Sequence, residues 1–443
     1  MQRTIRKFSI ESTPNLKDNL LSWSQQYETA IWLDSNEYHQ VYSSFDSILA
    51  VDEFTSIKTD YVNAFDKLKE YQSITQDYLF GYISYDVKNA TENLTSQNYD
   101  GLEFADLFFF QPQKILLINK NEIEFRYLSM VDEEIESDFE VIASLSTLSQ
   151  SRALDNEKDL DSAQPDIKVK LRIHKDEYYQ KVGKVLKHIH RGDIYEANFC
   201  QEFYAENATI NPLQVYKDLN AISEPPFATF LKVDEHYLLS ASPERYLKKE
   251  GSKVISQPIK GTAKRLLSRI DDEKIASDLA RDQKERAENI MIVDLVRNDL
   301  SRTAKKGSVT VEELCKVYSF KQVHQLVSTV VSEVDNAVHP VDVIKDTFPM
   351  GSMTGAPKIS AMNIIEQLEE TKRGLYSGTV GYFTPNGDFD FNVVIRSILY
   401  NELKNYVSFS VGSAITSKSI PEREYEECLL KAKAMKFVLS NSK

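Results

Sequence analysis

The chain has 443 residues, and its 53 Lys and Arg against 67 Asp and Glu give a formal net charge of −14. Every stretch rich in basic residues is interleaved with Asp and Glu, so a nucleic-acid partner is not expected. The 42% hydrophobic and 27% charged residues are typical of a globular protein, which excludes a disordered or fibrous chain. An uncharged or acidic small molecule is the more natural substrate.

The cysteines and the N-terminus argue against metal clusters and membranes. Cys200, Cys315 and Cys428 lie far apart in the sequence, so neither a zinc site nor a disulfide framework is indicated. No stretch approaches the roughly 20 apolar residues of a membrane span, and no apolar run follows the first residues. We therefore expect a cytoplasmic protein with no membrane partner.

Short runs rich in β-branched and aromatic residues predict strands in the first third of the chain, at residues 30–33, 79–85, 107–110 and 114–118. Residues 149–166 are polar and aperiodic. They predict a linker between an N-terminal segment, 1–148, and a C-terminal segment, 167–443.

In the C-terminal segment, helical spacing of apolar residues predicts helices over 174–191 and 276–298. Strands are predicted at 226–231, 237–240, 253–256, 325–334, 379–383, 392–400 and 406–411, with a tight turn at 385–388. Strand runs punctuated by single helices, without regular alternation, favour an α+β fold with largely antiparallel sheets.

Lys260 stands between Pro258-Ile259 and Gly261-Thr262, which predicts a lysine held in a fixed turn. An ammonium near apolar walls can lose its proton, because desolvation disfavours the charged form, and the free amine is a nucleophile. The spacing alone also fits a surface lysine that extends from a turn.

Two Glu-x-x-Glu pairs lie on predicted helices, Glu285 with Glu288 and Glu424 with Glu427. Each pair presents two carboxylates on one helix face, and oxygen ligands of this kind suit Mg²⁺. Acidic pairs at this spacing also arise by chance on solvated helix faces.

Two further features could bind an anion. The run from Gly351 to Lys358 opens a predicted helix, with Pro357 in its first turn, and a helix start can seat a carboxylate. An ordinary helix entry fits this run as well. Arg396 lies inside an apolar predicted strand, where it could grip a carboxylate or face solvent.

Taken together, these stretches resemble the chorismate-utilising enzymes, which include anthranilate, aminodeoxychorismate, isochorismate and salicylate synthases. The resemblance covers roughly residues 178 to 437. It is carried by the segments 192–198, 242–245, 258–262, 286–289, 293–299, 351–358, 376–382, 395–396 and 424–427. The fold that it implies is a two-subdomain sandwich of two facing antiparallel sheets with helices outside and the site in a cleft between them.

The resemblance implies a chemical role for each candidate residue. The lysine at position 260 resembles the lysine that aminodeoxychorismate synthases carry there. By this resemblance, Lys260 would add to C2 of chorismate as the C4 hydroxyl leaves, and ammonia would then displace it. Glu244 would protonate the leaving hydroxyl, and Thr262 would lie beside the nucleophile. Glu288 and Glu427 would hold Mg²⁺, with Glu285 and Glu424 behind them. The residues implied in substrate binding are Tyr376, Arg396, Ser352, Thr354, Gly412 and Lys431.

Three features depart from the family pattern. Gly412-Ser413-Ala414-Ile415-Thr416 places two small side chains where the family has Gly-Gly-Gly-Ile-Val. Gln325 stands where the family has a pocket histidine, and His324 is expected on the opposite face of its strand. Gln325 can donate a hydrogen bond but cannot act as an acid, so Glu244 is the main candidate for the general acid. Glu196 replaces the glutamine of the ammonia-using members and the water-activating lysine of the isochorismate and salicylate synthases.

The resemblance also implies partners. No cysteine lies in a Gly-x-Cys-x-Gly motif, so a separate glutamine amidotransferase subunit would deliver the ammonia, and the product would continue towards 4-aminobenzoate and folate. Ser35, in Trp32-Leu33-Asp34-Ser35, falls in a motif that holds tryptophan in some relatives. The alternatives are anthranilate synthase component I and a catalytically silent subunit that binds an amidotransferase.

Overall fold

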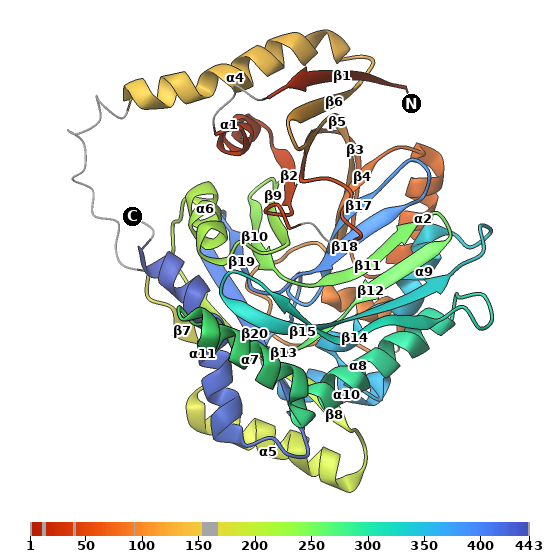
Figure 1. The fold of residues 1–443 in the computed structure, drawn as a ribbon, viewed down its shortest axis with the longest axis vertical. Helices are drawn as coiled ribbons and strands as arrows, with labels where there is room; N and C mark the ends of the chain where they lie inside the picture. The colour runs from red at the N-terminus through yellow and green to blue at the C-terminus, as the bar shows by residue number, and fades with distance from the viewer. Residues whose placement is uncertain (1, 11–14, 39–40, 93, 153–166, 442–443) are drawn as a thin grey trace.

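The computed structural model describes residues 2–10, 15–38, 41–92, 94–152 and 167–441. It confirms the α+β class, because every pairing between named strands is antiparallel and the helices lie around the outside of the strands (Figure 1). None of the helices in the described ranges is long and apolar enough to cross a membrane.

The strands form a continuous antiparallel array with two arms. The first arm runs in spatial order β7 (Lys170–Leu171), β8 (Glu196–Ala205), β20 (Tyr406–Thr416), β19 (Ser397–Asn401), β10 (His236–Ser242), β9 (Phe227–Val233), β2 (Thr29–Asp34) and β3 (Ser47–Thr59). The second arm runs β5 (Leu107–Asn119), β4 (Leu79–Ile83), β17 (Thr379–Phe383), β18 (Phe389–Val393), β11 (Arg245–Glu250), β12 (Lys253–Gln257) and β15 (Val323–Glu333). The remaining strands pair at the edges and are β13 (Ile259–Lys264), β14 (Thr310–Ser319), β6 (Glu122–Leu128), β1 (Arg3–Ser9) and β16 (Gly355–Ala356).

Two apolar clusters attach the helices to the arms. One cluster, around Trp32, Tyr178 and Phe230, is covered by α1 (Leu16–Trp23), α4 (Ile135–Arg152), α5 (Lys175–Arg191), α6 (Pro212–Ser223), α10 (Lys358–Leu368) and α11 (Pro421–Asn441). The other, around Phe80 and Phe109, is covered by α2 (Ala64–Thr75), α8 (Gln283–Ser301) and α9 (Pro340–Thr347). The short α3 (Lys88–Thr91) and α7 (Arg269–Arg281) complete the helices described.

Four predicted elements differ in how they are divided. The predicted helix over 276–298 is two helices, because the Asp282 side chain accepts hydrogen bonds from the backbone N–H groups of Lys284 and Glu285 and so starts α8. The predicted strand over 392–400 is β18 and β19, with Arg396 between them at φ 53°. The runs 107–110 and 114–118 are one strand, β5.

Strands of the two predicted segments pair directly, since β2 lies beside β9 and β4 beside β17. Residues 149–152 end α4, and 153–166 lie outside the described residues.

The chain crosses between the two arms twice at one place, from β10 to β11 and from β18 to β19. The Ser242 hydroxyl donates to the Val393 carbonyl at 2.6 Å, and the Val393 N–H donates to the Glu244 carbonyl at 3.0 Å. The Ala241 N–H donates to the Arg396 carbonyl at 3.2 Å. Glu244 and Arg396 are therefore fixed at the junction of the arms.

The close approach of β4 to β5 gives a first prediction. A Cβ at Gly81 would lie 2.0 Å from the Phe108 carbonyl oxygen, so we expect Gly81→Ala to lower the free energy of unfolding by about 3 kcal/mol or more. Gly183→Ala, inside α5 with open space around it, should instead raise that energy by about 0.5–1 kcal/mol. Urea unfolding measures both, and equal effects would contradict the prediction.

Candidate functional site

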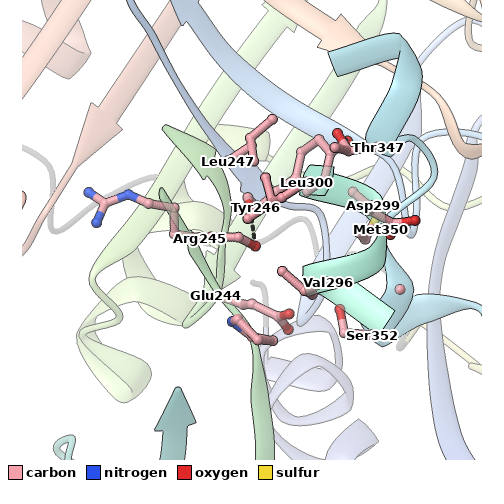
Figure 2. A pocket seen from close by; sticks show the side chains of 13 residues that line it. Glu244, Arg245, Tyr246, Leu247, Val296, Asp299, Leu300, Thr347, Met350 and Ser352 are labelled. Atoms are coloured by element: carbon pink, nitrogen blue, oxygen red, sulfur yellow. Dashed lines mark hydrogen bonds between the residues drawn. The ribbon is translucent and has the colours of Figure 1, made fainter. Parts of the chain in front are cut away.

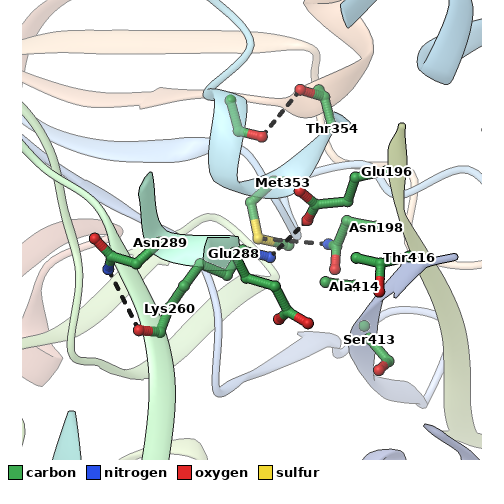
Figure 3. A network of polar contacts seen from close by, with 12 residues as sticks. Glu196, Asn198, Lys260, Glu288, Asn289, Met353, Thr354, Ser413, Ala414 and Thr416 are labelled. Atoms are coloured by element: carbon green, nitrogen blue, oxygen red, sulfur yellow. Dashed lines mark hydrogen bonds and ion pairs between the residues drawn. The ribbon is translucent and has the colours of Figure 1, made fainter. Parts of the chain in front are cut away.

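Lys260 lies in a β-bulge rather than in the predicted turn. β13 pairs with β15 through Ile259 with Val327 and Thr262 with Gln325, so β13 carries one extra residue between these pairs. Gly261 completes the bulge at φ +92°, a conformation that other residues rarely adopt. The Asn289 side chain of α8 donates to the Lys260 carbonyl at 3.3 Å (Figure 3) and so fixes the bulge.

The Lys260 ammonium lies against carboxylates. Its Nζ is 3.2 Å from Glu196 Oε1, and Glu288 extends towards the same space (Figure 3). Burial alone would lower the pKa of Lys260, but the charge and hydrogen bond of Glu196, helped by Glu288 and Glu244, raise it instead. The expectation that desolvation frees the amine is therefore wrong for the ligand-free protein.

Glu244 has the properties of a general acid. It is buried beside a cavity of about 20 Å³, room for roughly one water molecule, which β11, α8 and Ser352 line (Figure 2). Burial raises the pKa of Glu244 to about 7, although the Ser352 hydroxyl and the Lys260 ammonium favour its charged form. A carboxyl group with this pKa can hold a proton near neutral pH and donate it.

The two glutamate pairs lie on α8 and α11 and act on one another. Burial alone would lower the pKa of Lys284, but the charges of four carboxylates raise it; they are those of Glu285, Glu288, Glu424 and Glu427. Burial is the main cause that raises the pKa of Glu288 to about 7. Lys431 contacts Glu427 at 2.6 Å and, against the effect of burial, lowers the pKa of that carboxyl.

This set of groups fits a cation that completes its coordination with substrate or water. Within the described ranges, no three His, Cys, Asp or Glu side chains come close enough together to enclose a metal ion. Mg²⁺ usually takes only one or two protein carboxylates, so Glu288 and Glu427 would suffice. Glu424 is buried and accepts a hydrogen bond from Ser413, which suits a supporting position.

Arg396 and Tyr376 interact electrostatically near the junction of the arms. The Arg396 guanidinium has no hydrogen-bond or ion-pair partner among the described residues, and burial lowers its pKa, although Tyr376 and Glu427 counteract the shift. The Tyr376 hydroxyl is buried, 3.8 Å from Cys200 Sγ. A half-buried guanidinium without a partner is suited to a carboxylate ligand.

In the loop from Gly351 to Lys358, Ser352 lies towards Glu244, and Thr354 forms a hydrogen bond within the loop. The Thr354 hydroxyl donates to the Gly351 carbonyl at 3.2 Å, so it shapes the loop. Pro357 immediately precedes α10 instead of lying in its first turn. Lys358 is the first residue of α10, and its ammonium pairs with the buried carboxylate of Asp299 in α8 at 2.6 Å.

Gln325 and His324 lie on opposite faces of β15, as their alternation predicts. Gln325 is buried and its Nε2 lies 3.5 Å from the Thr262 hydroxyl, whereas His324 Nε2 contacts Asp272 Oδ1 at 3.0 Å under α7. Lys431 of α11 donates to the Gly412 carbonyl of β20 at 2.8 Å, so these two candidate residues are in contact.

The sequence reasoning missed a buried ion pair under the site. The Arg373 guanidinium binds both carboxylate oxygens of Glu369, at 2.6 and 2.9 Å, and donates to the Met353 carbonyl at 2.7 Å and the Asn198 carbonyl at 2.8 Å. The i,i+4 spacing of an acid and an arginine was the available signal, but that spacing is common on exposed helices.

Ser35 lies away from these groups, at a second cavity of about 50 Å³. Aromatic side chains of Tyr38, Phe45, Phe227 and Tyr382 line it, with Asp34 and Asp390 among its polar groups.

Comparisons with known proteins identify the family. Residues 28–437 match the family described as chorismate binding enzyme. The chain belongs to this family. It is a chorismate-utilising enzyme.

The relatives of this chorismate-binding enzyme carry more than one activity. It is 33% identical over 372 residues to aminodeoxychorismate synthase component 1 of Bacillus subtilis (strain 168), across 82% of this chain and 77% of that protein. It is also 33% identical over 364 residues to anthranilate synthase component 1 of Aquifex aeolicus (strain VF5), across 81% and 73%. The crystal structure of anthranilate synthase component I from Streptococcus pneumoniae TIGR4 has a similar fold, with a TM-score of 0.74 and 26% identity, over 90% of this chain and 94% of that one.

The raised pKa of Glu244 predicts a pH-dependent cost of folding. An ionised Glu244 is disfavoured in the folded state, so its cost appears as pH rises from about 4.5 to about 7 and reaches roughly 3 kcal/mol at most. Glu244→Gln should therefore gain stability relative to the wild type between pH 5 and pH 8, as measured by urea unfolding. Glu250→Gln, at the exposed end of the same strand, is the control, and a constant difference between E244Q and the wild type would refute the assignment.

Proposed function

We propose that this chain is the synthase component of an aminodeoxychorismate synthase, which converts chorismate and ammonia to 4-amino-4-deoxychorismate. The observation that carries the proposal is the Lys260 nitrogen in the cleft, 3.2 Å from Glu196 and within the electrostatic reach of Glu244 and Glu288. The carboxylates hold Lys260 as an ammonium in the ligand-free protein, so they could accept its proton and give the free amine that a nucleophile needs.

In the first step, the neutral Lys260 amine forms a bond to C2 of chorismate as the bond from C4 to its hydroxyl breaks. Glu244 gives its proton to that hydroxyl, which leaves as water. Lys260 must change from an ammonium to an amine, and the proton that it loses restores the acid form of Glu244. The step therefore needs no further acid. Arg396 would hold a substrate carboxylate so that C2 lies next to the lysine.

Glu288 and Glu427 would hold Mg²⁺, and Glu285 and Glu424 would support them. When bound, the ion supplies positive charge that neutralises a substrate carboxylate and orients the ring. Four carboxylates against the ammonium groups of Lys284 and Lys431 leave an excess of negative charge, which a divalent ion would balance.

Ammonia would come from glutamine through a separate amidotransferase subunit, as the name "component 1" of the Bacillus subtilis relative implies. The product keeps its enolpyruvyl group and would pass to a lyase that releases 4-aminobenzoate for folate synthesis. We place the enzyme in the cytoplasm, where these substrates are made.

The Lys260→Ala variant tests this function. Wild-type protein with chorismate, Mg²⁺ and ammonium should yield 4-aminobenzoate when aminodeoxychorismate lyase is added, and the variant should lose roughly 10³-fold or more of that rate, because it lacks the nucleophile. Lys264→Ala, at the end of the same strand, is the matched control and should keep the activity. Anthranilate as the product would favour anthranilate synthase component I, and unchanged chorismate, even with an amidotransferase present, would favour a silent subunit.

We also propose that the cavity beside Ser35 binds tryptophan. Its aromatic walls suit an indole ring, for which the cavity of about 50 Å³ would have to widen. Asp34 and Asp390, which pair with Lys17 and Arg245 in the ligand-free protein, offer carboxylates for the α-amino group. Isothermal titration of the wild type should detect tryptophan binding, and Ser35→Leu should weaken it at least about tenfold by filling the cavity. Ser56→Leu, on an exposed part of β3, should bind like the wild type, and heat released equally by all three proteins would show a different site.

A further inference from the structure

The bulge at Lys260 is held by a side chain of α8. In β13, Lys260 and Gly261 together lie opposite the single residue Leu326 of β15. The Asn289 side-chain amide donates to the Lys260 carbonyl at 3.3 Å (Figure 3) and to the Leu326 carbonyl at 3.1 Å. An extra residue interrupts the ladder between two strands, so backbone carbonyls at a bulge need donors from outside it. Asn289 supplies both donors from one amide nitrogen.

Another bulge lies on the other edge of β15 and is bound to the same amide. In β14, Leu314 and Cys315 lie opposite the single residue Ser328, and Cys315 has a φ of 51°. The Ser328 hydroxyl accepts a hydrogen bond from the Cys315 N–H at 2.9 Å and donates one to the Asn289 side-chain oxygen. Asn289 is 1% exposed, and both ends of its amide are hydrogen-bonded. The amide therefore joins the two bulges across β15.

The bulge determines the direction in which Lys260 points. Side chains alternate between the two faces of a strand, so the extra residue in β13 decides which face carries the lysine. In this register the Lys260 ammonium reaches Glu196 of β8, in the other arm, at 3.2 Å. Loss of the bulge would change the alternation and turn the side chain away from that strand. The donors that hold the bulge therefore also hold the direction of the amine.

α8 packs closely onto this bulge. A Cβ at Gly261 would lie 3.2 Å from the Glu285 side chain and 3.0 Å from that of Leu326, which leaves little room for a larger residue. Glu285, Glu288 and Asn289 are spaced three and four residues apart, so they share one face of the helix. Glu288 extends towards the Lys260 ammonium (Figure 3). The hydrogen bonds of Asn289 therefore fix β13 relative to the helix that carries these carboxylates.

We propose that Asn289 is the positioning residue for Lys260: by bonding the two carbonyls of the β13 bulge, it holds the lysine in the direction from which its amine reaches C2 of the substrate. The inference rests on the proposed amination of chorismate, in which Lys260 forms the bond to C2. Asn289 acts through Lys260 and contacts no reacting atom. Because its amide carries no charge, it fixes the lysine backbone without adding to the charges around the ammonium.

The Asn289→Leu variant tests the assignment, because leucine has a similar shape but no donor. The full-length protein is assayed with chorismate, Mg²⁺, ammonium and added aminodeoxychorismate lyase. We expect kcat for 4-aminobenzoate to fall about 10²-fold and the KM for chorismate to stay within about threefold, since the groups that bind the substrate are unchanged. Asn19→Leu is the matched control, because the buried Asn19 amide on α1 donates to the Ile142 carbonyl at 2.9 Å, and this variant should keep the wild-type kcat.

Two further measurements separate positioning from a general loss of structure. Hydrogen exchange of the ligand-free protein needs no reaction, and we expect the backbone amides of residues 259–263 to exchange at least about tenfold faster in N289L than in the wild type, because the bulge opens more often. Ser328→Ala removes the hydroxyl between the two bulges and should lower kcat by about three- to tenfold. The double variant N289L/S328A should have the kcat of N289L, since both changes act on one contact.

Each other outcome overturns the proposal. Wild-type kcat in N289L with faster exchange would mean that Asn289 supports only the fold, and a raised KM at unchanged kcat would mean that it acts on substrate binding. If N289L does not fold, S328A decides, and wild-type kcat in that variant would refute the assignment. If the wild-type protein itself forms no 4-aminobenzoate, the proposed function fails, whereas the exchange difference between N289L and the wild type persists, so the two failures are distinguishable.

Discussion

Pairing of buried opposite charges holds the site of this chorismate-binding enzyme together. Lys260 of β13 pairs with Glu196 of β8, and Lys358 of the α10 start pairs with Asp299 of α8. Each pair joins elements that are far apart in sequence. Removing one partner of such a pair leaves an uncompensated charge in a poorly hydrated place, which costs several kcal/mol, so the elements can shift only together. The geometry of the cleft therefore depends on charge balance as much as on apolar packing.

The same balance explains why Lys260 is an ammonium in the ligand-free protein. Glu196, Glu288 and Glu244 outweigh the desolvation of Lys260, so the amine becomes reactive only after protons and charges are redistributed. Glu244, whose pKa is about 7, is the group in the cleft best placed to exchange a proton near neutral pH. A substrate that brings its own carboxylates changes this balance, and Arg396, which lacks a protein partner, offers a counter charge for one of them.

Local patterns in the sequence predict the helices and strands better than the places where the chain passes from one strand to the next. Helical spacing located α5, and the tight turn at 385–388 lies between β17 and β18 as predicted. The sequence predicts Arg396 inside a strand, because the residues on both sides of it are apolar. In the structure the strand is interrupted at Arg396, at φ 53°, where the chain crosses between the arms. That crossing is set by tertiary hydrogen bonds to Ala241 and Val393, which no local spacing encodes. The resemblance to a known family named the candidate site residues, but only the fold shows that Glu196 contacts Lys260 and that Arg373 supports the strand that carries Glu196.

Two side chains on different strands set the charge around Lys260. Gln325 of β15 adds no charge, because an amide does not titrate, whereas Glu196 of β8 contributes a buried carboxylate whose Oε1 lies 3.2 Å from the lysine. Glu244 lies at the junction of the arms, next to the loop that carries Ser352. The second oxygen of Glu196, Oε2, has no hydrogen-bond partner among the described residues. The charge state of Lys260 therefore depends above all on β8, and the pairing of β8 with β16 and β20 fixes the position of that carboxylate.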